Sequence, residues 1–415
     1  MKRLALYLIF LFTTTIPALA STEPVLRLSL QECMDSAMAN NGRISLARME
    51  IEKATIMKGT AFNPSKTSVT LKQETTGGGG PDNGVAFGQE FEFPTVYIAR
   101  NKVLTAEENL QRSAFDQASF DLENEVAKEY YTMLYQLEML KLNSALADLY
   151  GNFHQLASKR FELGDCSALE VLNAQRMADL NHMEGEDIRR DLDQTTRRMM
   201  TLTGTQIPVM PADTILPRII FVTDSCGFDY QTTVMARVAD SEIELLNRNA
   251  SLARQEMLPD ISLGATVQAL IKGFNPYHIE RERFKQGNFM AFEIGISLPV
   301  FFGAQKSKIK AAETDISIAR LRKETAASEA EKEYEALLSR LEKAVGRLAF
   351  YDENALSQAE EIKRLADVSY EYGEIDYMEY INNLQTYYSV KKEYVEAINE
   401  YNMTVLQLMV LTGKK

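Results

Sequence analysis

The chain repeats a pattern at an offset of 209 residues. The segments RFELGDCSALEVLNAQ (160–175) and SYEYGEIDYMEYINNL (369–384) each contain a glycine, Gly164 and Gly373, and 373 − 164 = 209. Further pairs match at this offset: Phe161 with Tyr370, Glu162 with Glu371, Asp165 with Glu374, Glu170 with Glu379, Asn173 with Asn382, and the ending MMTLTG (199–204) with LMVLTG (408–413). A repeat of this length predicts that the chain folds as two copies of one unit.

Most of each copy has the period of a helix. From about 97 to 156 there is no proline, and apolar residues recur every three or four positions. In the second copy, the apolar positions of 334–362 and 381–409 alternate between spacings of three and four, broken only at Asp352, Lys391 and Asn402. This spacing is typical of a coiled-coil seam. A helix of about 60 residues is about 90 Å long, which favours a rod or a tube over a globule.

Four short segments alternate apolar and polar residues instead. They are TSVTLKQ (67–73), VAFGQEFEF (85–93), ISLGATVQA (261–269) and MAFEIGISL (290–298). Alternation with period two predicts strands with one apolar face, which is typical both of a membrane barrel wall and of a half-buried hairpin. The glycine-rich connection 74–84 lacks the ending of a phosphate-binding loop and is interpreted as a flexible surface loop.

The start of the chain predicts export. A basic pair, an apolar run and the sequence Ala18-Leu19-Ala20 indicate a signal peptide over 1–20, and no cysteine follows it that would carry a lipid anchor. After it, no apolar run approaches the length of about 20 residues that a spanning helix needs. The mature chain is therefore either soluble or crosses a membrane as a barrel. Because the smallest membrane barrels have about eight strands, several chains would have to share one barrel.

The mature chain divides into two repeats and a connector. The first repeat, 21–204, has a helix, a β-hairpin at about 65–93 and two long helices that meet at Gly164. A connector with several prolines covers 205–227. The second repeat, 228–413, has a helix, a β-hairpin at about 260–298 and two long helices that meet at Gly373.

Composition and motifs give little support to other classes of function. The charged fraction of 25% and the hydrophobic fraction of 45% predict a folded protein, and the net charge of −13 disfavours a nucleic acid partner. Cys33, Cys166 and Cys226 are too few to staple the fold and are interpreted as packing residues, with their pairing left open. The three histidines are isolated, and no metal, cofactor or catalytic motif is visible, so no enzyme is predicted.

The order of these elements, the paired glycine turns and the paired LTG endings resemble the TolC family of outer-membrane efflux proteins. The segment 160–175 is similar to the family's turn motif, and 26–54 is similar to its first helix. The resemblance implies a mostly α fold with membrane β: a long α-helical coiled-coil barrel plus a 12-stranded β-barrel shared by a homotrimer, four strands per protomer, with an internal two-fold repeat. It implies a passive exit duct in the outer membrane, with a large periplasmic portion. A periplasmic adaptor (membrane fusion protein) and an inner-membrane transporter of the RND, ABC or MFS type would open it.

The resemblance also implies a gate. By the family's pattern, Glu379 and Asn382 face the pore and form rings at a constriction, to which we also assign Asp376. A ring of carboxylates raises its own pKa values and favours passing cations. Both positions are commonly acidic in the family, so Asn382 lowers the expected charge. Tyr370 and Glu170 match a pair that holds the family's closed state. A solvated helix face is the alternative for these residues.

Two further sets of residues are candidates. The helix tips at Gly164, Asp165, Gly373 and Glu374 match the region where adaptors dock in the family. A glycine lets a helix end and the chain reverse, and an acid is favoured near the start of the next helix, so capping alone is the alternative for the two acids. The polar strand faces carry the acids expected in the barrel lumen: Glu90, Glu92 and Glu293.

A soluble periplasmic coiled-coil adaptor or scaffold protein is the alternative function. Such adaptors usually carry one helical hairpin, whereas two are predicted here. The exported substrate is not specified by this sequence, because the inner-membrane pump selects it.

Overall fold

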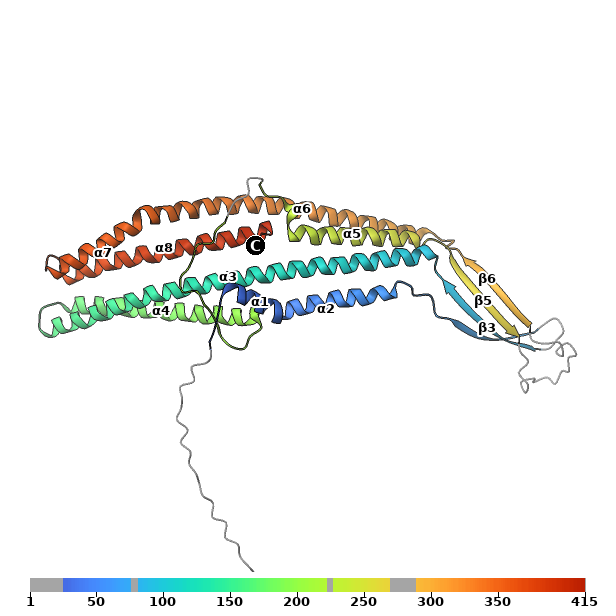
Figure 1. Cartoon of the computed structure of the whole chain (residues 1–415), viewed down its shortest axis with the longest axis horizontal. Helices are drawn as coiled ribbons and strands as arrows, with labels where there is room; N and C mark the ends of the chain where they lie inside the picture. Colours follow the sequence, from blue (N-terminus) through green and yellow to red (C-terminus); the bar gives the residue numbers. More distant parts are fainter. Residues whose placement is uncertain (1–24, 76–80, 222–226, 269–288, 415) are drawn as a thin grey trace, which may run out of the picture.

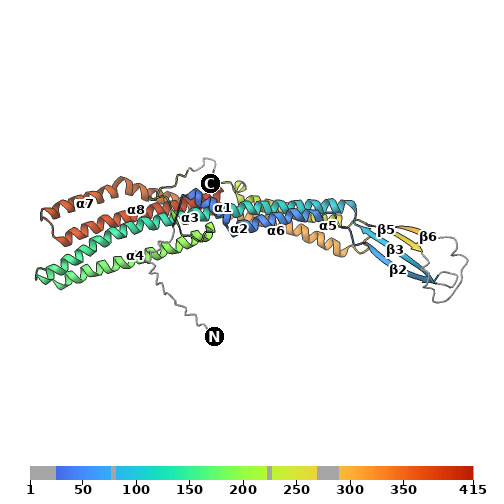
Figure 2. The same cartoon turned by 60° about the horizontal axis from the view of Figure 1, so that its bottom comes forward.

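The computed structural model describes residues 25–75, 81–221, 227–268 and 289–414. The molecule is a long rod in which helices occupy most of the length and a small sheet lies at one end (Figure 1). At the opposite end, two pairs of long helices finish in two separate tips (Figure 2). The signal peptide expected over 1–20 and Cys226 lie outside the described residues.

The first repeat begins with two short helices, α1 (Leu30–Asn40) and α2 (Gly42–Met57), and a 3₁₀ turn, η1 (Lys58–Thr60). Strands β2 (Ser68–Thr75) and β3 (Pro81–Phe91) follow, and then helices α3 (Pro94–Glu162) and α4 (Ala168–Thr203). The segment 26–54 was expected to contain one first helix, but the helix is broken at Asn41. The side chain of Asn41 caps α2 by accepting the N–H of Arg43 at 2.8 Å.

The second repeat begins with a 3₁₀ turn, η2 (Tyr230–Thr232), and helix α5 (Val234–Gln255). Its strands are β5 (Asp260–Gln268) and β6 (Phe289–Ser297), and its helices are α6 (Gly303–Phe350), α7 (Leu356–Glu371) and α8 (Tyr377–Thr412). The α6–α7 segment and α8 begin and end 209 residues after α3 and α4, which confirms the internal repeat. A π-helical turn, Tyr351–Ala355, separates α6 from α7 and was not predicted.

The four predicted strands form one antiparallel sheet in the order β2-β3-β5-β6. The two hairpins are joined because β3 pairs with β5, with Phe87 opposite Ala265. β2 reaches Thr75 and β3 starts at Pro81, so strands occupy much of the connection that was expected to be a loop over 74–84. The sheet leaves β2 and β6 as its two edges.

One face of this sheet is apolar and exposed. The register places Val69, Phe87, Ala265 and Phe292 in one row, and paired residues point to the same side. Phe292 is 75% exposed, and Ile294 on the same face is 78% exposed. The opposite face carries small and polar residues, such as Ser68 and Gly264. Within the described ranges, no helix has the length and apolar character to cross a membrane.

The main hydrophobic core forms where α1, α3, α4, α8 and the connector meet. Leu122 and Met199 are fully buried in it, as is Cys33, whose pKa is raised to about 11 by burial. A short parallel sheet of β1 (Leu26–Leu28) and β4 (Val209–Pro211) joins the start of the chain to the connector. This sheet was not predicted, since three-residue strands are too short to show a period.

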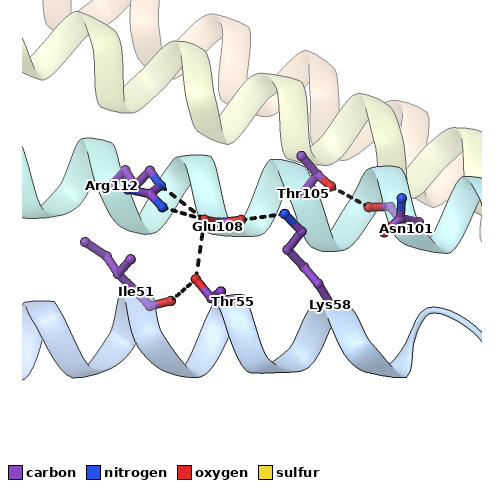
Figure 3. Close-up of polar contacts among 7 residues, drawn as sticks. All are labelled: Ile51, Thr55, Lys58, Asn101, Thr105, Glu108 and Arg112. Atoms are coloured by element: carbon purple, nitrogen blue, oxygen red, sulfur yellow. Dashed lines mark hydrogen bonds and ion pairs between the residues drawn. The ribbon is translucent and has the colours of Figure 1, made fainter.

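A buried carboxylate joins α2 to α3 (Figure 3). Glu108 is only 6% exposed, and its carboxylate accepts from Lys58 at 2.9 Å, from Arg112 at 2.6 Å and from Thr55 at 3.3 Å. The hydrogen bonds from Lys58 and Arg112 lower the pKa of Glu108 to about 2 despite its burial. Two cations therefore compensate the charge, and the cluster fixes how α2 lies against α3.

Candidate functional site: the paired helix tips

Each tip turns in the same backbone conformation. Gly164 has φ +80° and Gly373 has φ +74°, a left-handed conformation that favours glycine. At the first tip, the N–H of Gly164 donates to Phe161 O at 3.0 Å and the N–H of Asp165 to Arg160 O at 2.8 Å. The second tip repeats both bonds at the 209-residue offset. This pair of bonds is the Schellman motif, which satisfies the last carbonyls of the helix.

The helix caps lie two residues beyond the acids considered for that role. The side chain of Ser167 accepts the N–H of Glu170 at 3.3 Å, and Asp376 accepts the N–H of Glu379 at 2.8 Å. Asp165 is not the cap of α4, because its N–H closes the Schellman motif and the next helix starts only after Ser167. The alternative that Asp165 and Glu374 act as helix caps is therefore wrong.

The five expected gate residues lie at the tips, and the chain gives several of them local partners. Asp376 caps α8, while Glu379 and Asn382 are exposed and three residues apart on α8. Glu170 accepts from Arg160 at 3.0 Å. Among the described residues, no hydrogen bond joins Glu170 to Tyr370, so the pairing of these two in a closed state stays a prediction.

A tyrosine cluster surrounds Tyr370 and was not predicted from the sequence. The ring of Tyr370 stacks on Tyr380, with centroids 4.6 Å apart, and lies 5.4 Å from Tyr377. The hydroxyl of Tyr380 donates to Asp367 at 2.9 Å, and burial together with this carboxylate raises the pKa of Tyr380 to about 12. Four tyrosines of α8 recur every seven residues, but only Tyr380 of them belongs to this cluster, so that spacing does not indicate it.

The second helix pair, α6–α7 with α8, packs against the first pair, α3 with α4, near the tips. Ile381 of α8 is fully buried in a cluster with Tyr150 and Phe153 of α3. Farther from the tip, Lys392 of α8 forms an ion pair with Glu184 of α4. These contacts hold α8 against α3 and α4 within one chain.

The acids expected in the barrel lumen have different surroundings. Glu90 and Glu293 are exposed on the polar face of the sheet, where Glu293 lies over Gly264. Glu92 follows the end of β3 and forms an ion pair with Arg100 at 2.7 Å. Its charge is compensated locally, so Glu92 contributes less to an acidic surface than Glu90 and Glu293. In the described ranges, no group of acidic, histidine or cysteine side chains could hold a metal ion.

Solved structures with this fold include membrane proteins and an outer membrane channel. A membrane protein from Pseudomonas aeruginosa matches with a TM-score of 0.76 and 17% identity over 94% of this chain and 91% of that chain. The outer membrane protein VceC of Vibrio cholerae matches with a TM-score of 0.72 and 16% identity over 93% and 96%. The open state of the MtrE outer membrane channel of Neisseria gonorrhoeae matches with a TM-score of 0.71 and 18% identity over 93% and 89%.

The sequence itself shows the family. Residues 83–205 and 237–414 match the model of the outer membrane efflux protein family. Because this match covers more than half of the chain, the protein belongs to that family, and the resemblance inferred from the sequence is confirmed. Among curated proteins, no match to the chain was found.

Proposed function

We propose that this protein is the exit duct of a tripartite efflux or export system and works as a homotrimer in the outer membrane. The observation that carries the proposal is the exposed apolar face of the four-stranded sheet, with Phe292 at 75% and Ile294 at 78% exposure. Lipid covers such a face if the sheet is part of a barrel wall. The edges β2 and β6 would pair between protomers, and three sheets would give the twelve strands expected from the sequence.

The duct is passive, and its gate lies at the helix tips. In the trimer, Glu379 and Asn382 form rings near the axis, with Asp376 holding the start of α8 at the constriction. Tyr370 and Glu170 of neighbouring protomers hold the closed state. The exposed acids of the polar sheet face, Glu90 and Glu293, line the barrel lumen together with Glu92.

The partners follow from the two tips. A periplasmic adaptor docks at the turns around Gly164 with Asp165 and Gly373 with Glu374, and an inner-membrane transporter of the RND, ABC or MFS type supplies the energy. The signal peptide over 1–20 exports the chain without lipidation. A soluble periplasmic scaffold would cover its apolar surface within its own fold, and the apolar sheet face argues against that alternative.

Single-channel conductance in planar bilayers tests the proposal. Wild-type protein should give small currents, and Glu379→Ala should raise them and lower the preference for cations, because the ring loses its carboxylates. Tyr370→Phe should also raise the current if the tyrosine hydroxyl holds the closed state. Glu374→Ala is the matched control, since Glu374 is an exposed acid of the same tip outside the ring. Folded protein without any channel activity would exclude the duct.

A further inference from the structure

Residues 212–219 of the connector, which we call the strap, bridge the two helix pairs (Figure 1). On the side of the first pair, the hydroxyl of Tyr130 donates to Asp213 at 2.7 Å and Lys141 donates to the carbonyl of Thr214 at 2.6 Å. Both side chains belong to α3. Leu216 is buried in the main core, so the strap is fixed to the first pair by packing as well.

On the side of the second pair, α8 binds the backbone of the strap. Asn402 is fully buried, and its side chain accepts the N–H of Ile219 at 2.9 Å and donates to the carbonyl of Pro217 at 2.8 Å. The hydroxyl of Tyr401 donates to the carbonyl of Ile219 at 3.0 Å. Asn402 interrupts the apolar seam of the sequence because its side chain holds the strap.

Arg218 extends from the strap to the π-helical turn. Its guanidinium donates to the carboxylate of Asp352 at 2.6 Å and to the hydroxyl of Tyr394 at 2.7 Å, and it lies 5.6 Å from the centroid of the Tyr394 ring. Asp352 is a residue of the π-helical turn, and Tyr394 faces it from α8. One strap side chain thus connects both helices of the second pair.

The π-helical turn is specific to the second repeat. The N–H of Leu356 bonds to the carbonyl of Tyr351, five residues back, whereas α3 is a continuous α-helix at the equivalent positions. At the 209-residue offset, Asp352 corresponds to Asn143. Asn143 bonds directly to the partner helix, donating to the carbonyl of Asn181 at 2.9 Å. The first pair is closed at this level without the strap. In the second pair, Arg218 adds to two direct bonds between the π-helical turn and α8, in which Tyr394 donates to Asp352 at 3.3 Å and Tyr351 donates to Glu393 at 2.9 Å.

A π-helical turn is a local defect in the hydrogen-bond ladder where helices change direction. The helix bends toward the tip where α6 passes into α7 (Figure 1). Between this turn and the tip, α7 and the first part of α8, 377–394, form an arm. The arm meets the first pair through Ile381 and the ion pair of Lys392 with Glu184.

We propose that the strap and the π-helical turn are the pivot of this arm. When the arm moves away from α3 and α4, the change in backbone direction is taken up at Tyr351–Ala355. Arg218 ties Asp352 and Tyr394 to the strap, and Asn402 and Tyr401 hold the rest of α8 there, so the base of α8 stays on the strap. Arg218 is therefore a positioning residue of the gate. The pivot itself does not rest on the proposed function, but the role of its movement in opening a duct does.

Hydrogen–deuterium exchange of the full chain in detergent tests the pivot without requiring a current. In Arg218→Ala, exchange across 351–371 should rise by about tenfold, which is the scale set by losing hydrogen bonds of a charged group. Exchange in the part of α3 at 100–120, before the residues that bind the strap, should not change. Arg218→Lys should restore part of the protection, because it keeps the charge next to Asp352 without the second hydrogen bond.

Arg340→Ala is the matched control, since Arg340 also bonds from α6 to α8, to Gln407 at 3.4 Å, without touching the strap. Unchanged exchange over 351–371 in this control supports the pivot. Equal effects of Arg218→Ala and Arg340→Ala, or no effect of Arg218→Ala, would overturn it. If the protein gives no current but Arg218→Ala alone raises exchange, the duct fails and the pivot stands.

Discussion

At the scale of single residues, buried charges decide how the helices fit together. Glu108 lies in an ordinary helical segment of the sequence, and nothing in the spacing distinguishes it from exposed acids of α3. In the structure it is buried and receives hydrogen bonds from two helices (Figure 3). Its partners Lys58 and Thr55 come from α2 and the turn that follows it, about fifty residues earlier, so only the packing of α2 on α3 creates the site.

The pKa of Glu108 gives a prediction about pH. Because the hydrogen bonds lower this pKa from 4.5 to about 2, the carboxylate stabilises the fold fully above its ordinary pKa and loses this effect as the pH falls toward 2. Glu108→Gln should therefore lower the thermal unfolding midpoint by several degrees at pH 7, and the difference from wild type should shrink below pH 4.5. Thermal scans between pH 2 and pH 7 measure it.

Glu50→Gln is the control for this prediction. Glu50 pairs with Lys53 on the exposed side of α2, where both side chains are more than half exposed. Surface pairs of this kind contribute little, so its scans should follow those of the wild type. A pH-independent difference for Glu108→Gln would show that packing, not charge, is the role of Glu108.

At the scale of elements, the same sequence ending produces the same helix end in both repeats. MMTLTG and LMVLTG each finish in a glycine with φ +68°, Gly204 and Gly413. The tips repeat this conformation at Gly164 and Gly373. The regularity is local, and the repeat therefore predicted it. Differences between the repeats, such as the π-helical turn, arise where helix faces meet different neighbours.

Gly164 and Gly204 of the first repeat are expected to lose different amounts of stability when each is replaced by alanine. An L-residue in the left-handed conformation costs about 1–2 kcal/mol, and at Gly164 a Cβ would meet no other atom within 4 Å. At Gly204 a Cβ would lie 2.8 Å from the backbone oxygen of Asn40. Gly164→Ala should therefore lower the unfolding midpoint slightly and Gly204→Ala clearly more, by calorimetry in detergent. Equal shifts would contradict the contact with Asn40.

At the scale of the whole molecule, the two faces of the sheet differ in polarity, and this difference predicts which face contacts lipid. The apolar face is continuous across all four strands because the register aligns their apolar positions, for example Leu71, Val85, Val267 and Met290 in one row. A single strand of this kind is ambiguous between a half-buried hairpin and a barrel wall. The structure leaves this face exposed within the chain, which is what the proposed lipid contact needs.

Two neighbouring residues of β6 test this assignment. Phe292→Lys places a charge on the apolar face, where it costs about 2–4 kcal/mol near the middle of a bilayer, and should reduce the amount of SDS-resistant trimer in outer-membrane fractions severalfold. Ala291→Lys changes the other face, opposite Thr266, and should be tolerated. Equal losses for both variants would mean that the apolar face is not the lipid-facing one.

The sequence by itself determined the long helices, the four strands of the larger sheet and their order, because helical and strand periods, glycine turns and the 209-residue repeat are local properties of the chain. It also located both tips, including Gly164 and Gly373. Only the tertiary structure decided which polar residues meet: Glu108 with Lys58, Asn402 with the strap, and Arg218 with Asp352 at the π-helical turn. These contacts join residues that are 50 to 185 positions apart. Their partners depend on the angle and register of packed helices, which no local spacing specifies.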